Sequence, residues 1–225
     1  MSGIAVSGRI AETFFSIQGE GATAGLPAIF VRLQGCSVGC RWCDTKYSWD
    51  PVAGREVSLD GLLEEIASYP CHRVVITGGE PLESALFLPL VVALAQEGFR
   101  IEVETSGTLP PPPEAATEIQ WNVSVKPGGS GVSEAKRVNP KAIRAFLARN
   151  AWWKFVVTEA ADVVEVLGLA ERFALPRERI LLQPECLRTE EFMARAPWVA
   201  EACKAHGFRF SPRLHVLLWG ARRGV

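Results

Sequence analysis

The chain has 225 residues, with 24 basic and 25 acidic side chains and a formal net charge of −1. Apolar residues make up 48% of it and charged residues 22%, which supplies material for a large core and excludes general disorder. No run of Lys and Arg is long enough to follow a phosphate backbone, so nucleic acid is not an expected partner.

The predicted elements alternate along the chain. Apolar, β-branched-rich runs predict six buried strands, at residues 28–33, 74–77, 101–104, 123–125, 153–157 and 180–183. Helical periodicity lies between them, at residues 58–68, 84–97, 140–150, 161–173 and 189–206. Such βαβ units predict an α/β fold with a parallel sheet, curved into a partial, TIM-like barrel of about six strands.

One domain over residues 1–225 is the default at this length, with residues 208–225 as a C-terminal strand and tail extension. Residues 211–220 look like the added strand. Residues 1–10 lack the pattern of a secretory signal, and no segment reaches ~18 uninterrupted apolar residues. We therefore expect a cytoplasmic protein that does not contact a membrane.

Three of the six cysteines lie close together in the sequence, as Cys36, Cys40 and Cys43. They directly follow the strand predicted at residues 28–33, at the end where a barrel of this kind keeps its functional groups. Three thiolates on one loop can hold three irons of a four-iron, four-sulfur cluster and leave the fourth iron open. The scattered cysteines are expected to be ordinary core or surface thiols: Cys71, Cys186 and Cys203.

A zinc site is the alternative use of these three thiols. Structural zinc takes four ligands, and no second pair of Cys or His at short spacing is present. Catalytic zinc usually includes a histidine, and the sequence has only His72, His206 and His215. A zinc site with three thiolates and a water remains open at this point.

The Cys-x3-Cys-x2-Cys loop, with Trp42 before its last cysteine, resembles the signature of the radical S-adenosylmethionine superfamily. Residues 77–81, Thr-Gly-Gly-Glu-Pro, end the next strand and resemble the GGE motif of that superfamily. The resemblance implies a partial barrel of the radical SAM type, in which S-adenosylmethionine binds the open iron. Gly78 and Gly79 are expected to let the main chain approach the cofactor more closely than a Cβ would allow.

Within the superfamily, the sequence resembles the 7-carboxy-7-deazaguanine synthases over most of its length. The resemblance implies a lyase that converts 6-carboxy-5,6,7,8-tetrahydropterin into 7-carboxy-7-deazaguanine with loss of ammonia, in the 7-deazapurine and queuosine pathway. It also implies Mg²⁺ and a radical that removes hydrogen from carbon 6 of the pterin. The segments that carry it are residues 16–21 (SIQGEG), 30–36 (FVRLQGC), 43–45 (CDT), 104–107 (ETSG) and 124–127 (SVKP).

Residue roles follow from these matched segments. Thr45 is expected to bind Mg²⁺, Glu20 to accept from the pterin NH groups, and Arg32 to pair with the substrate carboxylate as a guanidinium fork does. The alternatives are a structural ion pair for Arg32, a surface carboxylate for Glu20 and a loop-capping hydroxyl for Thr45. The predicted substrate contacts are Ile17, Gln18, Gly19, Glu20, Arg32 and Thr77. The predicted S-adenosylmethionine contacts are Gly79, Glu80, Glu104, Ser106, Ser124, Val125, Lys126, Gln183, Pro184 and Glu185.

Family analogy further implies a homodimer and a flavodoxin- or ferredoxin-type electron donor. A glycyl-radical activase, which acts on a polypeptide with the same cysteine spacing, remains the closest alternative enzyme. SIQGEG and CDT are harder to explain in such an enzyme. His215 is expected to be a structural histidine rather than a substrate contact. Some family members place their terminal residue near the substrate, and for Val225 this role stays open.

Overall fold

The structure is a computed structural model that describes residues 6–115, 118–220 and 222–225. Its described strands form one sheet in the order β3-β1-β2-β4-β5-β6-β7-β8-β9. The strands are β1 (Ser7–Ile17), β2 (Pro27–Leu33), β3 (Arg55–Ser58), β4 (Arg73–Gly78), β5 (Arg100–Thr105), β6 (Gln120–Val123), β7 (Trp152–Val157), β8 (Ile180–Pro184) and β9 (Arg209–Phe210). The helices are α1 (Leu59–Ala67), α2 (Phe87–Gln96), α3 (Glu134–Arg137), α4 (Pro140–Leu147), α5 (Ala160–Phe173), α6 (Thr189–His206) and α7 (Leu214–Trp219).

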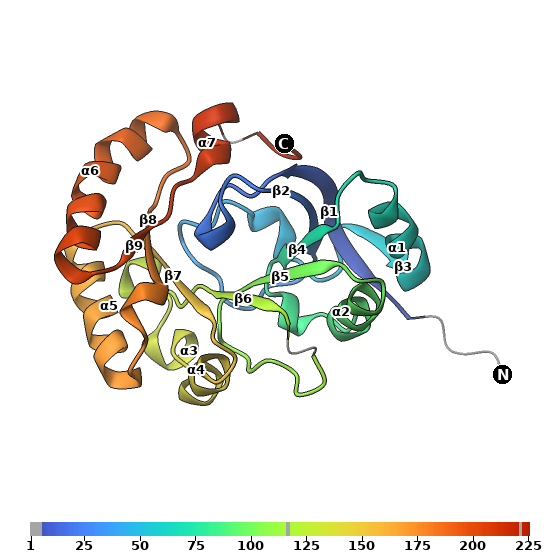
Figure 1. The fold of residues 1–225 in the computed structure, drawn as a ribbon, viewed down its shortest axis with the longest axis horizontal. Coiled ribbons are helices and arrows are strands. Elements are labelled where there is room, and N and C mark those ends of the chain that lie inside the picture. The colour runs from blue at the N-terminus through green and yellow to red at the C-terminus, as the bar shows by residue number, and fades with distance from the viewer. Residues whose placement is uncertain (1–5, 116–117, 221) are drawn as a thin grey trace.

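The sheet curves into an open barrel with its helices on the outside (Figure 1). From β2 to β9 every neighbouring pair of strands is parallel. β1 runs antiparallel to both β2 and β3 at one edge. The predicted α/β fold with a partial barrel is therefore confirmed, and the six predicted strands correspond to β2, β4, β5, β6, β7 and β8.

The two faces of the parallel strands differ in polarity. Outward positions are apolar and pack under the helices, as Trp153, Phe155 and Val157 do on β7. Many inward positions carry polar or charged side chains because they face the barrel interior and its cavity, although Phe30 and Val156 also line the cavity. The inward polar residues include Arg32, Thr77, Glu102, Glu104, Gln120, Asn122, Lys154 and Gln183.

β6 begins three residues earlier than predicted. The polar residues Gln120 and Asn122 made this segment look unlike a buried strand. Both side chains donate to the buried carboxylate of Glu102, at 3.2 Å and 3.4 Å, so their polarity is satisfied inside the barrel. The outward partners Trp121 and Val123 lie in the core. The alternation is therefore that of a strand with a polar interior face.

The C-terminal segment differs from the predicted strand. In the described part of this segment, Arg209–Phe210 pairs with the sheet as β9, and residues 214–219 form helix α7. Pro212 lacks a backbone N–H and interrupts the segment between the two elements. Two strands at the antiparallel edge, β1 and β3, were not predicted. Among the described helices, none has both the length and the apolar composition that crossing a membrane requires.

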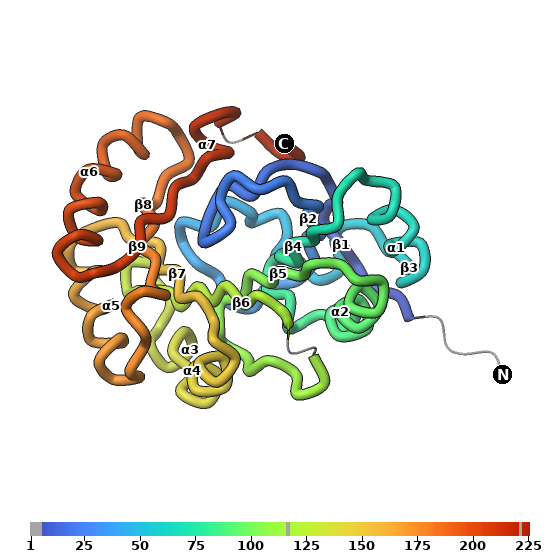
Figure 2. Tube along the Cα trace, in the orientation of Figure 1, coloured from blue at the N-terminus to red at the C-terminus, as the bar shows by residue number. Residues whose placement is uncertain are grey.

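The connection between β1 and β2 folds into the barrel instead of lying outside it (Figure 1). Thr23 in this loop donates to Glu102 on β5 at 2.7 Å. The C-terminus returns to the same end of the molecule, near β2 (Figure 2). There Arg223 donates to Glu12 of β1 at 3.2 Å and 3.3 Å. Both segments therefore lie close to the carboxyl ends of the parallel strands.

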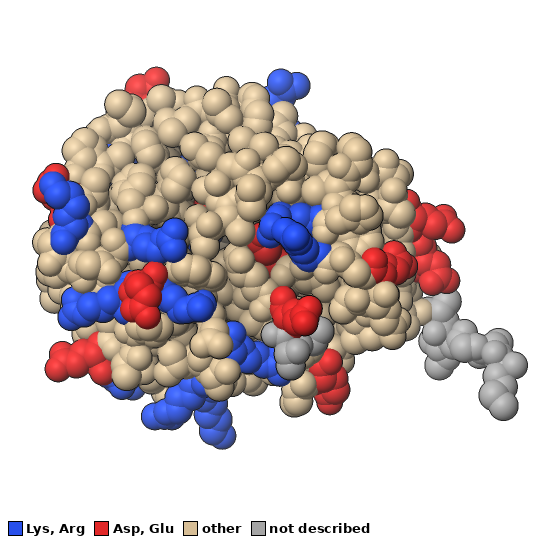
Figure 3. Space-filling view, in the orientation of Figure 1, with Lys and Arg blue, Asp and Glu red and all other residues tan. Residues whose placement is uncertain are grey.

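On the face shown in Figure 3, acidic and basic side chains are scattered between large uncharged areas. This distribution agrees with the near-zero net charge of the sequence.

Candidate active site

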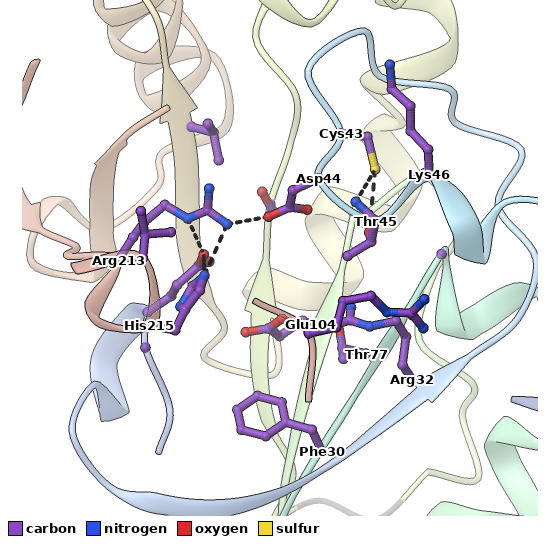
Figure 4. Close-up of a pocket in the computed structure, with 18 of the residues that line it drawn as sticks. Phe30, Arg32, Cys43, Asp44, Thr45, Lys46, Thr77, Glu104, Arg213 and His215 are labelled. Atoms are coloured by element: carbon purple, nitrogen blue, oxygen red, sulfur yellow. Dashed lines mark hydrogen bonds and ion pairs between the residues drawn. The ribbon is translucent and has the colours of Figure 1, made fainter. Parts of the chain in front are cut away.

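A cavity of about 520 Å³ opens at the carboxyl ends of the parallel strands. The loop after β2, the β1–β2 connection and the C-terminal segment complete its wall. Figure 4 shows Arg213 and His215 on one side, Arg32 and Thr77 on the other, and Asp44 and Thr45 near the cysteine loop. Every residue that the sequence predicted for the site lines this cavity, apart from Glu80, Val125 and Pro184.

The three cysteines of the predicted loop share the cavity wall. The backbone of this loop is anchored by Gly35 N–H to Ser48 O at 2.8 Å and by Arg41 N–H to Ser130 O at 2.9 Å. The Cys43 sulfur accepts from the backbone N–H of Thr45 at 3.4 Å and from the indole N–H of Trp49 at 3.3 Å. Donors aimed at sulfur stabilise a thiolate, which is the form that binds iron.

Burial raises the pKa of the Cys36 and Cys40 thiols, so both are protonated in the absence of a metal. Among the described residues, no three Cys, His, Asp or Glu side chains converge as the ligands of one metal ion do. A cubane binds each thiolate at a different iron, so its ligands need not converge on one point. The donor set and its position at the cavity therefore fit an iron–sulfur cluster.

The glycine pair at the end of β4, Gly78 and Gly79, lies against the cysteine loop. A Cβ on Gly79 would stand 2.1 Å from Gly35 O and 2.6 Å from the Cβ of Cys36. A Cβ on Gly78 would stand 2.3 Å from Leu33 O. The backbone N–H of Gly79 donates to Leu33 O at 3.1 Å. From the sequence, these glycines were expected to allow the cofactor to approach, but here the close contact is with the chain itself.

Glu80, predicted to contact the cofactor, does not line the cavity. Its side chain is 1% exposed and accepts from Thr105 Oγ1 at 2.7 Å and from Ser106 N–H at 2.7 Å. Burial nevertheless raises the pKa of this carboxyl. Its observed contacts tie the end of β4 to the end of β5. Val125 and Pro184, also predicted as cofactor contacts, have buried side chains that do not line the cavity.

The β1–β2 connection brings an amide and a carboxylate to the cavity. Gln18 is 2% exposed, and its Nε2 donates to Glu104 at 3.3 Å. Glu20 accepts from Lys154 of β7 and from Arg213 Nε, the latter at 2.8 Å. Burial alone would raise the pKa of Glu20, but Lys154 and Arg213 hold it well below its usual range. Glu20 is therefore a buried, paired carboxylate and not the surface carboxylate of the alternative interpretation.

Arg32 forms the ion pair that the sequence analysis kept as an alternative. Its Nε donates to Glu12 of β1 at 2.8 Å. The Glu12 carboxylate also accepts from the Tyr47 hydroxyl at 2.6 Å. Burial raises the pKa of Tyr47 to about 12, so the hydroxyl remains a donor at neutral pH. Arg32 still lines the cavity. Among the described residues, Glu12 accepts from the Nε–H of Arg32 and leaves the Nη groups of Arg32 unused.

Thr45 and Asp44 follow Cys43 directly and reach the same cavity. The Thr45 hydroxyl lies 3.5 Å from the Cys43 sulfur. The backbone carbonyl of Thr45 accepts from Ser48 Oγ at 2.7 Å. Asp44 accepts from Arg213 (Figure 4). The predicted magnesium ligand thus lies between the cysteine loop and the charged wall.

The remaining predicted cofactor contacts end the strands beyond β4. Lys126 donates to Ser124 Oγ at 2.8 Å, and its ammonium lies 5.7 Å from the centre of the Trp42 ring. Gln183 accepts from Ser211 Oγ at 3.0 Å. Glu104 accepts from Thr77 Oγ1 at 3.1 Å and lies 3.9 Å from Lys154, so it belongs to the same polar wall as the predicted substrate contacts.

Several residues that line the cavity were not predicted from the sequence. Lys154 had a usable signal, because a lysine within the apolar run Trp152–Val157 must be paired when it is buried. Arg213 and Glu12 had no local signal, because their partners lie far away in sequence. His215 lies at the cavity wall, 3.3 Å from an Arg213 nitrogen, and burial lowers its pKa.

Residues 30–121 match the family described as the Radical SAM superfamily. The chain is 40% identical to the 7-carboxy-7-deazaguanine synthase of Pyrobaculum aerophilum over 220 residues, with 96% of each chain covered. The corresponding synthase of Hyperthermus butylicus is 39% identical, over 93% of this chain and 92% of its own. The crystal structure of QueE from Escherichia coli matches with a TM-score of 0.73 and 31% identity, covering 91% of this chain and 93% of that chain.

The similarity in sequence extends over nearly the whole length of both chains, well beyond the cysteine loop. The superfamily implies a four-iron, four-sulfur cluster and S-adenosylmethionine as cofactors. This chain therefore belongs to the 7-carboxy-7-deazaguanine synthase family of the radical S-adenosylmethionine superfamily.

Proposed function

We propose that this chain converts 6-carboxy-5,6,7,8-tetrahydropterin into 7-carboxy-7-deazaguanine with loss of ammonia, within 7-deazapurine biosynthesis. One observation carries the proposal. The three cysteines lie on the same cavity as an amide, a carboxylate and a guanidinium, namely Gln18, Glu20 and Arg32. A pterin ring has a flat edge of donors and acceptors and here carries a carboxylate, so it needs partners of these kinds.

The chain's own residues would bind and orient the pterin. Glu20 is ionised at neutral pH because of its two cationic partners, so it can accept from pterin NH groups. The Nη groups of Arg32 can pair with the substrate carboxylate, while Glu12 holds the Nε side and fixes the plane of the guanidinium. Ile17, Gly19 and Thr77 complete the proposed substrate contacts.

Cys36, Cys40 and Cys43 would hold the cluster, and Thr45 would contribute a hard oxygen to Mg²⁺. When bound, the cluster and S-adenosylmethionine supply a radical that can remove a hydrogen atom from carbon 6 of the pterin. The proposed contacts of S-adenosylmethionine are the cavity-lining residues Gly79, Glu104, Ser106, Ser124, Lys126, Gln183 and Glu185.

The proposal includes a single domain, a cytoplasmic homodimer and a flavodoxin- or ferredoxin-type electron donor. Sedimentation of the reconstituted protein tests the dimer, and a monomer at all concentrations would exclude it. The electron source is tested by mixing each candidate donor protein with the oxidised cluster. A donor that reduces the cluster lowers the absorbance of the cluster near ~400 nm.

The proposed reaction is tested by anaerobic reconstitution with iron and sulfide, followed by S-adenosylmethionine, Mg²⁺, dithionite and carboxytetrahydropterin. We expect 7-carboxy-7-deazaguanine and ammonia in equal amounts, identified by mass spectrometry and an ammonia assay. A protein that cleaves S-adenosylmethionine but forms no deazaguanine would refute the substrate assignment. A colourless protein that retains stoichiometric zinc would refute the cluster.

A further inference from the structure

Arg213 lies between β9 and α7, and its side chain is only 8% exposed. Each of its three guanidinium nitrogens is used. Nε donates to Glu20 at 2.8 Å, Nη2 donates to Asp44, and Nη1 donates to the Cys186 carbonyl. One side chain thus joins the β1–β2 connection, the cysteine loop and the segment after β8. Figure 4 shows its contact with Asp44.

The two carboxylates that Arg213 joins flank the proposed substrate position. Glu20 belongs to the proposed pterin contacts, whereas Asp44 lies between Cys43 and the proposed magnesium ligand Thr45. A guanidinium presents its donors in one rigid plane, so it can fix the direction of two carboxylates at once. A lysine ammonium at this position could keep the charge but not this planar geometry.

The carboxylates beside Arg213 are paired with cations. Glu20 and Asp44 are opposed by Arg213 and by Lys154 from β7. Loss of Arg213 would leave Glu20 with Lys154 as its remaining close cation. The imidazole of His215 lies 3.9 Å from Glu20, and burial together with the charge of Arg213 lowers its pKa.

The segment that carries Arg213 is also docked on the β1–β2 connection through its backbone. Leu214 N–H donates to Gly19 O at 2.9 Å, and Gly21 N–H donates to Ser211 Oγ at 2.9 Å. A Cβ on Gly19 would stand 2.1 Å from Nδ1 of His215. The position of the Arg213 backbone is therefore fixed relative to the loop that carries Glu20.

We propose that Arg213 is a positioning residue of the synthase, which holds Glu20 and Asp44 in the geometry that receives the pterin and its bound Mg²⁺. This inference rests on the proposed function. It makes the C-terminal segment a working part of the substrate site. Substrate affinity and the concentration of Mg²⁺ needed for half-maximal rate should therefore both depend on Arg213.

The test compares Arg213→Lys and Arg213→Gln with wild-type holoenzyme. Arg188→Gln is the matched control, because Arg188 is 72% exposed and, among the residues that the structure describes, pairs with the neighbouring Glu191 on the surface. We expect KM for carboxytetrahydropterin to rise about 10- to 100-fold in both Arg213 variants, as for residues that orient ligand-binding groups. Iron content and substrate-free cleavage of S-adenosylmethionine should match the control, because neither requires Glu20.

A second measurement does not depend on turnover. The dissociation constant of 6-carboxypterin, a stable oxidised analogue, is measured by quenching of tryptophan fluorescence. In both Arg213 variants this dissociation constant should rise by a factor similar to that of KM. Arg213→Lys should not restore the wild-type value. A KM and a dissociation constant equal to those of Arg188→Gln would overturn the proposal. Equal loss of iron, S-adenosylmethionine cleavage and pterin binding would also overturn it, because Arg213 would then serve folding.

A double-mutant cycle separates action through Asp44 from independent effects. If Arg213 acts through this carboxylate, Arg213→Gln combined with Asp44→Asn should raise KM by less than the product of the single effects. A double variant whose KM rises by the full product of the two single effects would contradict the coupling between Arg213 and Asp44. Wild-type enzyme that forms no deazaguanine refutes the proposed function, and the 6-carboxypterin titration then still decides whether Arg213 organises a pterin site.

Discussion

Gly79 lies where the end of β4 meets the cysteine loop, and its missing side chain is a packing requirement. A methyl group would overlap Gly35 O and the Cβ of Cys36, so one of the two segments would have to move. The glycine thereby sets the distance between the GGE segment and the cluster loop.

Gly79→Ala is expected to lower stability by about 1–3 kcal/mol, as overpacking does, and to reduce the iron bound after reconstitution. Gly168→Ala is the control, because Gly168 lies within α5 and a Cβ there meets nothing within 4 Å. The control should be neutral or more stable by about 0.5–1 kcal/mol. Urea unfolding measures the stability of the two variants, and iron analysis measures the iron that each binds. Normal iron loading of Gly79→Ala would show that the loop adapts.

Glu20 gives a pH dependence whose sign follows from its depressed pKa. A carboxyl with a lower pKa in the folded state stabilises the protein fully above its unfolded pKa. That stabilisation is lost as the pH falls from the ordinary glutamate pKa of 4.5 towards the lower pKa of the folded state. Glu20→Gln should therefore be less stable than wild type by about 1–3 kcal/mol at pH 7, and the difference should shrink below the unfolded pKa. Urea unfolding of the apoprotein across this range measures it, and a pH-independent difference would contradict the assigned pairing.

At the scale of elements, the β1–β2 connection and α7 form one unit that closes the cavity. The connection enters the barrel because Glu20 and Thr23 pair with residues of β7 and β5. The helix then packs onto Gly19, where any side chain would meet His215. Neither element is part of the parallel barrel, yet both contribute to the cavity wall.

Gly19→Ala should displace α7 and lower stability by about 1–3 kcal/mol, since its Cβ would overlap the His215 ring. Hydrogen exchange should accelerate in Leu214–Trp219 and stay unchanged in α5, which lies apart from this contact. His215→Ala combined with Gly19→Ala should recover part of the stability, because it removes the overlapping ring. If the double variant loses as much stability as the two single variants together, overlap with the His215 ring is not the cause of the loss in Gly19→Ala.

The helix and strand patterns of the sequence predict some elements better than others. Helix α6 begins and ends where predicted, at Thr189 and His206, and Gly207 ends it in a left-handed conformation. β6 was misplaced because Gln120 and Asn122 face a buried carboxylate that lies on another strand. α7 was taken for a strand because its short apolar run has no long periodic pattern.

At the scale of the whole molecule, the main core and the cysteine loop are packed separately. The large core lies between the outward faces of the strands and the helices, and includes Trp121 and Trp153. The cysteine loop instead packs in a small cluster around Val38, Cys40 and Val132. The fold therefore does not depend on the metal in the way that a zinc finger does.

Removal of iron by an anaerobic chelator should leave the far-UV circular dichroism spectrum unchanged while it abolishes cleavage of S-adenosylmethionine. The melting temperature should fall by only about 2–4 °C, which corresponds to about 1 kcal/mol for a domain of this size. Restored iron and sulfide should restore the cleavage activity. A cooperative loss of helical signal on chelation would show that the cluster is part of the folding core.

The sequence by itself determined the parallel barrel, the cysteine loop at the end of its first parallel strand and the family to which the chain belongs. Those features are local, because strand alternation, helix periodicity and ligand spacing are all recorded within short segments. Only the tertiary structure decided which partners Arg32, Glu20 and Glu80 have, and that Lys154 and Arg213 belong to the cavity. These pairings join residues up to 193 positions apart, so burial and charge balance in the folded chain select them, and no local pattern records them.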